Sequence, residues 1–119
     1  MTTIPHLAPL TEAGDFLFLS GQLPFNRDRA IASSGIEEQT TQVMENIIAV
    51  LADAGLTLAD VVKATVWLKR ASDFVGFNES YARAFGSHKP ARSTVVSDLM
   101  VPAALVEIEV IARRSGKTA

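Results

Sequence analysis

Apolar residues recur at helical spacing in two segments of the chain, and both segments have recognisable ends. In the first, Ser34 and Glu37 are spaced as a capping box, and Gly55 is the expected C-terminal stop. The second begins at Ser72 and stops at Gly86. The apolar stripes consist of Val43, Met44, Ile47, Val50, Leu51 and Ala54 in the first segment and of Phe74, Phe77, Tyr81, Ala84 and Phe85 in the second. The pattern predicts two amphipathic helices, each with one face directed at a core.

Two further segments are typical of strands. Residues 16–20 are apolar almost throughout, which predicts a strand buried on both faces. Residues 61–69 alternate, which predicts a strand with one core face and one more polar face. Trp67 falls on the polar side and indicates that this face meets another surface. The first eleven residues carry two prolines and are expected to form an extended arm, and residues 30–32 are a candidate short strand.

The segment from Lys89 to Arg114 combines strand patterns with charged side chains. Pro90 favours an extended start, so Arg92, Thr94 and Val96 are expected on one face of a strand beginning at residue 91 or 92. A second strand, residues 105–112, puts Leu105, Glu107, Glu109 and Ile111 on one face. A simple hairpin centred on residues 99–100 would place Arg92 opposite Glu107, although a bulge would shift this register.

The order of these elements predicts one α+β domain over residues 1–119. Two single amphipathic helices can cover only one face of a single mixed sheet. The other face then has no helices left to cover it, and oligomerisation is the economical way to bury it.

Composition narrows the possible functions. The chain has 119 residues, of which 48% are hydrophobic, and a formal net charge of -2 with no basic stripe. Nucleic acid is therefore not an expected partner. The absence of cysteine excludes disulfides and thiolate chemistry. No N-terminal pattern of a signal peptide and no long apolar run is found, so we expect a cytoplasmic protein with no membrane partner.

Four motifs occur in an order that is specific in combination. They are Gly14-Asp-Phe-Leu-Phe-Leu-Ser-Gly-Gln-Leu-Pro24, Asp60-Val-Val-Lys-Ala-Thr-Val-Trp-Leu68, Asn78-Glu-Ser-Tyr81, and Pro90-Ala-Arg-Ser-Thr-Val95 followed by Glu107-Ile-Glu109. With these motifs the chain resembles the RidA/YjgF family of reactive-intermediate deaminases, which also carries the older label of L-PSP endoribonuclease or translation inhibitor. The resemblance covers essentially the whole chain.

The resemblance implies a chorismate-mutase-like mixed sheet with two helices on one face, assembled as a homotrimer with ligand clefts between subunits. It implies hydrolysis of enamines and imines such as 2-aminoacrylate to a 2-oxo acid and ammonia, with no metal and no cofactor. By the same resemblance, Arg92 grips the substrate carboxylate and Glu107 positions or activates water. Ser20, Asn78 and Thr94 match positions that line or brace the cleft.

Two positions depart from the family pattern. The commonest deaminases of the family have a cysteine two residues after the arginine, where this chain has Thr94. That residue contributes mainly through its backbone and the shape of the pocket, so threonine need not abolish activity. The N-terminal segment also differs, and the tyrosine that would close the pocket falls at Leu7. Both departures bear on which substrate the protein takes.

Three functional hypotheses remain open from the sequence. Arg92 could be satisfied by an ion pair with Glu107 or Glu109, or it could await a carboxylate, for which its guanidinium offers bidentate geometry. An Arg92 that awaits a substrate carboxylate supports the deaminase hypothesis. The alternatives are a small-carboxylate-binding protein without imine turnover and a ribonuclease, which an acidic chain favours least. His6 and His88 are expected to be exposed rather than catalytic.

Overall fold

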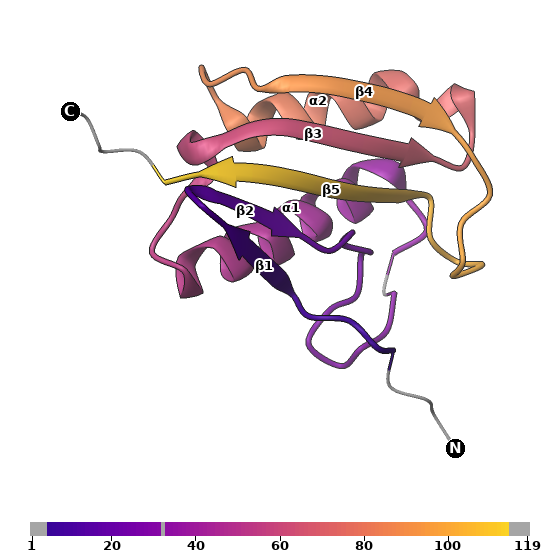
Figure 1. Ribbon diagram of the computed structural model, residues 1–119. Coiled ribbons are helices and arrows are strands. Elements are labelled where there is room, and N and C mark those ends of the chain that lie inside the picture. The colour runs from indigo at the N-terminus through magenta and orange to yellow at the C-terminus, as the bar shows by residue number, and fades with distance from the viewer. Residues whose placement is uncertain (1–4, 32, 115–119) are drawn as a thin grey trace.

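The computed structural model describes residues 5–31 and 33–114. It is a single five-stranded sheet in the order β1-β2-β5-β3-β4, with two helices packed against it (Figure 1). The elements along the chain are β1 (Leu10–Ala13), β2 (Phe16–Leu19), α1 (Ile36–Asp53), a 3-10 turn (Leu58–Asp60), β3 (Val61–Leu68), a second 3-10 turn (Ala71–Asp73), α2 (Phe74–Phe85), β4 (Ala91–Val96) and β5 (Val106–Arg113). The predicted α+β class and the order of the main elements are confirmed.

The N-terminal segment differs from the predicted extended arm. Residues 10–13 form β1, which pairs antiparallel with β2 so that Leu10 faces Leu19 in register. Residues 1–4 lie outside the described residues. So does residue 32 of the candidate short strand, and residues 27–30 form turns and bends rather than a strand.

The sheet is mixed, and this corrects the hairpin predicted for β4 and β5. Strand β3 lies between them, parallel to β4 and antiparallel to β5. β4 pairs parallel with β3 because α2 carries the chain back to the start of the sheet, as a helical crossover does between parallel strands. Residues 97–105 then cross over β3 to reach β5, so Arg92 lies beside Ala64, and Glu107 lies beside Trp67.

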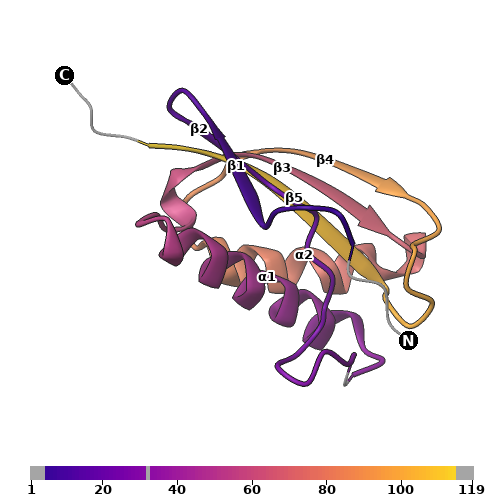
Figure 2. The same ribbon diagram turned by 60° about the horizontal axis from the view of Figure 1, so that its bottom comes forward.

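Both helices lie on the same face of the sheet, as predicted (Figure 2). Alternate residues of the inner strands point to them and form a closed core with α1 and α2, which includes Leu17, Leu19, Val43, Ile47, Leu51, Ala64, Val66, Leu68, Phe77, Val106, Ile108 and Val110. The opposite face has no covering layer among the described residues. Phe16 and Phe18 point to it and are 41% and 44% exposed, so the prediction that residues 16–20 are buried on both faces is wrong for the single chain.

The observed ends of helix α1 agree only in part with those predicted from the sequence. The Ser34–Glu37 capping box is wrong, because α1 begins after Gly35 and has no side-chain cap, while the Gly35 N–H donates to the Ser33 Oγ. The C-terminal stop is confirmed. Gly55 has a φ of 79°, and the Leu56 N–H donates to the Leu51 carbonyl, which is the hydrogen bond of a Schellman motif.

A buried glutamine joins α1 to the loop that precedes β5. The side chain of Gln39 is 1% exposed. Its Nε2 donates to the carbonyls of Ser33 and Ala103, at 2.8 and 3.0 Å, and its Oε1 accepts from the Leu105 N–H at 2.7 Å. These contacts hold residues 103–105, and therefore the entry into β5, against the first turn of α1.

We expect Gln39→Leu to lower the free energy of unfolding by about 3 kcal/mol, because it leaves the buried Leu105 N–H without an acceptor. Urea unfolding at a fixed protein concentration measures this. Gln42→Leu is the matched control, since the Gln42 side chain donates only to Asn46, and we expect a change below about 1 kcal/mol there. Equal effects of the two substitutions would contradict the proposed role of Gln39.

Candidate functional site

Arg92 lies on the helix-facing side of β4, the edge strand, and α2 holds its guanidinium. The Arg92 Nη2 donates to the Asn78 Oδ1 at 2.9 Å. The Arg92 Cζ lies 4.9 Å from the ring centroid of Tyr81 and 5.2 Å from that of Phe77, with Phe74 further out at 5.9 Å. These contacts come from one side of α2, where residues at i, i+3, i+4 and i+7 lie together. The ring faces favour the cation and fix its orientation.

No carboxylate neutralises Arg92 within residues 5–31 and 33–114, where the ion pairs are Arg70–Asp73 and Arg114–Glu12. A half-buried guanidinium with one amide partner still has donors to offer. It lines a pocket of about 330 Å3 together with Asn78, Tyr81, Ala82, Phe85, Gly86, His88, Lys89 and Pro90. The geometry therefore suits a small anion that docks on the exposed donors of Arg92.

Thr94 continues the same face of β4 and lines a second, apolar hollow of about 200 Å3 with Leu68, Ala71, Phe74, Val95 and Val96. The Ser97 N–H donates to the Leu68 carbonyl of β3. Successive amides of a strand point to opposite sides, so the N–H groups of Thr94 and Val96 point to the free edge of the sheet. The edge beside Arg92 thus presents a backbone donor at Thr94.

The phenol of Tyr81 is a further polar group in the Arg92 pocket. Its hydroxyl is buried and has no hydrogen-bond partner within the described residues. Burial raises the pKa of the Tyr81 phenol, and the nearby Arg92 guanidinium offsets part of that rise. Tyr81 therefore stays protonated and able to donate at neutral pH.

Glu107 lies on the open face of the sheet, beside Trp67 of β3. Its carboxylate lies directly over Gly21, so that a side chain larger than glycine at position 21 would collide with it. Partial burial raises the pKa of the Glu107 carboxyl, and the negative charge of Glu109 raises it further. Such a carboxyl can exchange a proton more readily near neutral pH than an exposed glutamate can.

The structure brings Arg92 and Asn78 together but separates Arg92 from Glu107, which corrects the predicted pair. The two side chains are on different strands, with β3 between them, and they point to opposite faces of the sheet. A single chain therefore does not place both in one pocket. The alternative in which Glu107 satisfies Arg92 within the chain is wrong as well, and so is an ion pair with Glu109.

The remaining predicted site residues have other partners. The Ser20 Oγ donates to the Ala8 carbonyl at 2.6 Å, and the Ser20 N–H donates to the Pro9 carbonyl, so Ser20 fastens the N-terminal segment to the end of β2. His6 is exposed as expected. His88 is half-buried, and its ring nitrogen lies 2.7 Å from the Val61 carbonyl, which differs from the expectation that it is exposed.

Comparison with known proteins identifies the family. The family model described as Endoribonuclease L-PSP matches residues 2–114. A RutC family protein of Pyrococcus horikoshii is 47% identical over 102 residues, covering 85% of this chain and 81% of that protein. The chain belongs to the RidA/YjgF family.

Two solved structures extend the likeness to the RidA/YjgF fold. The Yersinia pestis protein YyfA, described as a Rid family protein of unknown function, is 38% identical with a TM-score of 0.89, covering 95% of this chain and 91% of that chain. TdcF from E. coli, solved with bound serine, is 32% identical with a TM-score of 0.88 over the same shares, 95% and 91%. The mixed sheet with two helices on one face is the fold of these RidA/YjgF proteins.

Within residues 5–31 and 33–114, no cluster of three or more His, Cys, Asp or Glu side chains could hold a metal ion. In the same residues no helix has the length and apolar character needed to cross a membrane.

Sequence patterns alone do not predict the contacts of two groups at the candidate site. The spacing of Tyr81 within α2 predicts an inward side chain but not that Arg92 lies next to it. Gly21 permits a close approach by another group, but the sequence does not show that this group is Glu107. The contact with Glu107 requires the bridge between Gln22 and Ile108, which joins segments far apart in the chain.

We expect the Glu107 carboxyl to titrate above the ordinary glutamate range, and Glu109→Gln to lower the Glu107 pKa towards it, since removing the charge removes part of the shift. Carbon-13 NMR of the side-chain carboxyl measures both. A raised folded-state pKa means that ionisation of Glu107 disfavours the fold, so its destabilising effect is present above that pKa and is lost as the pH falls through it. A Glu107 carboxyl that titrates in the ordinary glutamate range would contradict the assignment.

Proposed function

We propose that the protein is a hydrolytic deaminase that converts reactive enamines and imines, such as 2-aminoacrylate and 2-iminopropanoate, to 2-oxo acids and ammonia. The observation that carries the proposal is Arg92, a half-buried guanidinium that α2 orients and that no carboxylate among the described residues neutralises. The bound serine of the related E. coli TdcF supports a small carboxylate-bearing ligand for this site as well.

Arg92 anchors the substrate carboxylate. The Arg92 guanidinium can donate two parallel hydrogen bonds to a carboxylate. Asn78 and the aromatic rings keep the guanidinium in this orientation. In the proposed complex, the outward N–H of Thr94 donates to the same carboxylate or to an atom next to it. Anchoring at two points orients the imine carbon for attack, which supplies most of what this hydrolysis requires.

Glu107 activates water in the proposed reaction. Its carboxylate takes a proton from water while the water oxygen bonds to the carbon of the protonated imine, which gives a neutral carbinolamine. Glu107 then returns this proton to the nitrogen, and the carbon–nitrogen bond breaks so that ammonia leaves. The carbinolamine hydroxyl gives its own proton to the Glu107 carboxylate as its oxygen becomes the 2-oxo group. A carboxyl with a raised pKa suits this double role, because it must accept and release a proton in one cycle.

The separation of the two residues supports a site shared between chains. Arg92 and Glu107 point to opposite faces of one sheet, so they can serve one substrate only if the open face of one chain packs near the β4 edge of another. The open face carries the exposed side chains Phe16, Phe18 and Val95, which favour such burial. We therefore propose a homotrimer with three identical clefts between subunits.

The first test is the hydrolysis of 2-aminoacrylate generated in solution, followed by ammonia release. We expect Arg92→Ala to lower kcat/KM at least about 100-fold, since a charge-assisted hydrogen bond contributes roughly 1.5–3 kcal/mol and the fork makes two of them. Arg27→Ala makes the same change of charge at an exposed position, and we expect it to keep full activity. An active Arg92→Ala variant, or a wild-type protein no faster than buffer, would refute the deaminase.

The second test is complementation between two inactive variants. Arg92→Ala and Glu107→Gln are unfolded together at equal concentration and refolded as mixed oligomers. If each cleft takes Arg92 from one chain and Glu107 from the next, about one quarter of the clefts regain both residues, because each is intact with a probability of about one half. We expect about a quarter of the wild-type activity and a trimer mass by light scattering.

Each variant refolded alone is the control for complementation, and it must remain inactive. Activity in Glu107→Gln alone would remove the proposed role of Glu107. A mixture that stays inactive would show that no cleft is shared in this way.

A carboxylate-binding protein without imine turnover is the second candidate function, and two observations favour it. Thr94 replaces the usual cysteine, and Leu7, where the family places a tyrosine, is 63% exposed rather than closing over a pocket. Pyruvate binding that requires Arg92, in a protein that does not release ammonia from 2-aminoacrylate, would establish this function. The ribonuclease of the family model's description has no support from the charge of the chain, which is -2.

A further inference from the structure

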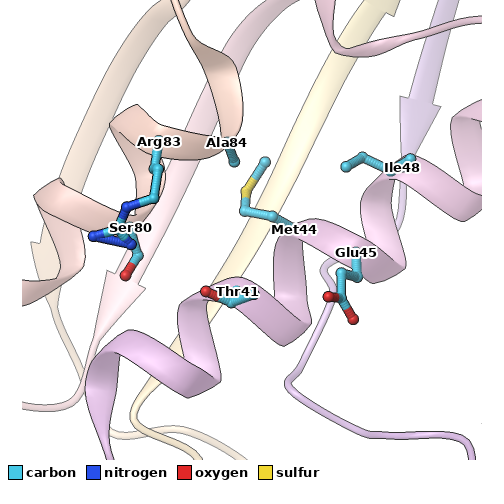
Figure 3. A pocket seen from close by; sticks show the side chains of 7 residues that line it. All are labelled: Thr41, Met44, Glu45, Ile48, Ser80, Arg83 and Ala84. Carbon is cyan, nitrogen blue, oxygen red and sulfur yellow. The ribbon is translucent and has the colours of Figure 1, made fainter.

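A pocket of about 180 Å3 lies between the two helices (Figure 3). Thr41, Met44, Glu45 and Ile48 of α1 form one wall, and Ser80, Arg83 and Ala84 of α2 form the other. None of these residues lines the Arg92 pocket, which takes Asn78, Tyr81 and Ala82 from α2. The two pockets therefore use different sides of the same helix.

One cation and one anion border this pocket without pairing with each other. Arg83 stands on α2 and Glu45 on α1, on either side of the hollow (Figure 3). Neither forms an ion pair with any charged group of residues 5–31 and 33–114. A ligand that carries both a carboxylate and an ammonium group could give each of them a counter-charge.

The hydroxyl of Ser80 is the second observation that points to a ligand. Ser80 is 2% exposed, and its Oγ is buried without a hydrogen-bond partner among the described residues. It lines the pocket, and Figure 3 shows its oxygen directed towards the space between the helices. A buried hydroxyl at the wall of a hollow can be satisfied by a polar group that enters the hollow.

Size and lining limit the ligand further. The pocket volume of about 180 Å3 suits a small ligand of about six to eight non-hydrogen atoms. Met44, Ile48 and Ala84 supply an apolar floor. An adjoining hollow shares Glu45, Ser80 and Arg83 and adds Glu37 and Glu38. This excess of carboxylates favours the ammonium end and disfavours a plain anion.

We propose that this interhelical pocket binds a free α-amino acid with a small apolar side chain, separately from the Arg92 site. Arg83 takes the amino acid's carboxylate, and Glu45 takes its ammonium group. The Ser80 hydroxyl makes a third polar contact, and the side chain lies on Met44, Ile48 and Ala84. L-alanine and L-valine, with about six and eight non-hydrogen atoms, fit the volume.

The test is an NMR titration of the Arg92→Ala protein with L-alanine and with L-valine, so that binding at the Arg92 site cannot contribute. We expect amide shifts confined to Thr41–Ile48 and Ser80–Ala84. Propionate lacks the ammonium group and ethylamine lacks the carboxylate, and we expect each to bind at least about tenfold more weakly than L-alanine. Glu45→Gln and Arg83→Gln should each weaken L-alanine binding at least about tenfold.

Two substitutions outside the pocket test whether binding depends on contacts within the pocket or only on the net charge of the protein. Glu79→Gln, on α2, and Arg70→Gln make the same changes of charge without lining the pocket, and we expect unchanged binding. Ser80→Ala should weaken binding without lowering the thermal stability, because it removes a buried hydroxyl that has no partner.

Two results would overturn the proposal. The first is the absence of amide shifts in these segments up to the solubility limit of both amino acids. The second is binding that Glu45→Gln and Arg83→Gln leave unchanged. Neither result depends on whether the protein hydrolyses imines, so the amino acid site and the deaminase activity are tested independently of each other.

Discussion

Successive side chains of a β-strand point to opposite faces of the sheet, and the placement of every candidate group depends on this constraint. It directs Arg92 and Thr94 towards α2, and it directs Glu107 and Trp67 to the open face. Because β3 separates β4 from β5, no local bend of a loop can bring Arg92 and Glu107 together. The chemistry proposed for this chain therefore depends on how sheets of different chains meet.

Helix α2 fixes the orientation of the Arg92 side chain. Asn78 supplies the hydrogen bond, and Phe77 and Tyr81 supply the ring faces, so the guanidinium is held without losing its charge to a neighbouring carboxylate. An ion pair at this place would have stabilised the cation but consumed the donors that a substrate carboxylate needs. Orientation by amide and aromatic groups keeps those donors available.

The two faces of the molecule suggest two kinds of recognition. The open sheet face carries exposed aromatic and aliphatic side chains next to a carboxylate with a raised pKa, a combination suited to a contact between subunits with a reactive group at its border. The helical layer faces away from that contact. Its interhelical pocket, with Arg83 and Glu45 on opposite walls, could respond to a metabolite without competing for Arg92.

Periodicity in the sequence was sufficient for the presence of both helices, for most of β3 and for the two faces of β5, because each of these depends on spacing along one segment. It failed at two element ends: Phe74, in the predicted core stripe of α2, is 44% exposed, and a bulge between Val61 and Lys63 interrupts the alternation of β3. The motifs that carry the family resemblance also assigned Arg92 and Glu107 to strands and Asn78 to a helix. The partner of each strand could not be read in this way. Only the tertiary structure decided that β4 pairs with β3 rather than with β5, since strand order depends on contacts between residues far apart in the chain. That decision separates Arg92 from Glu107 and gives Arg92 the ring of Tyr81 instead.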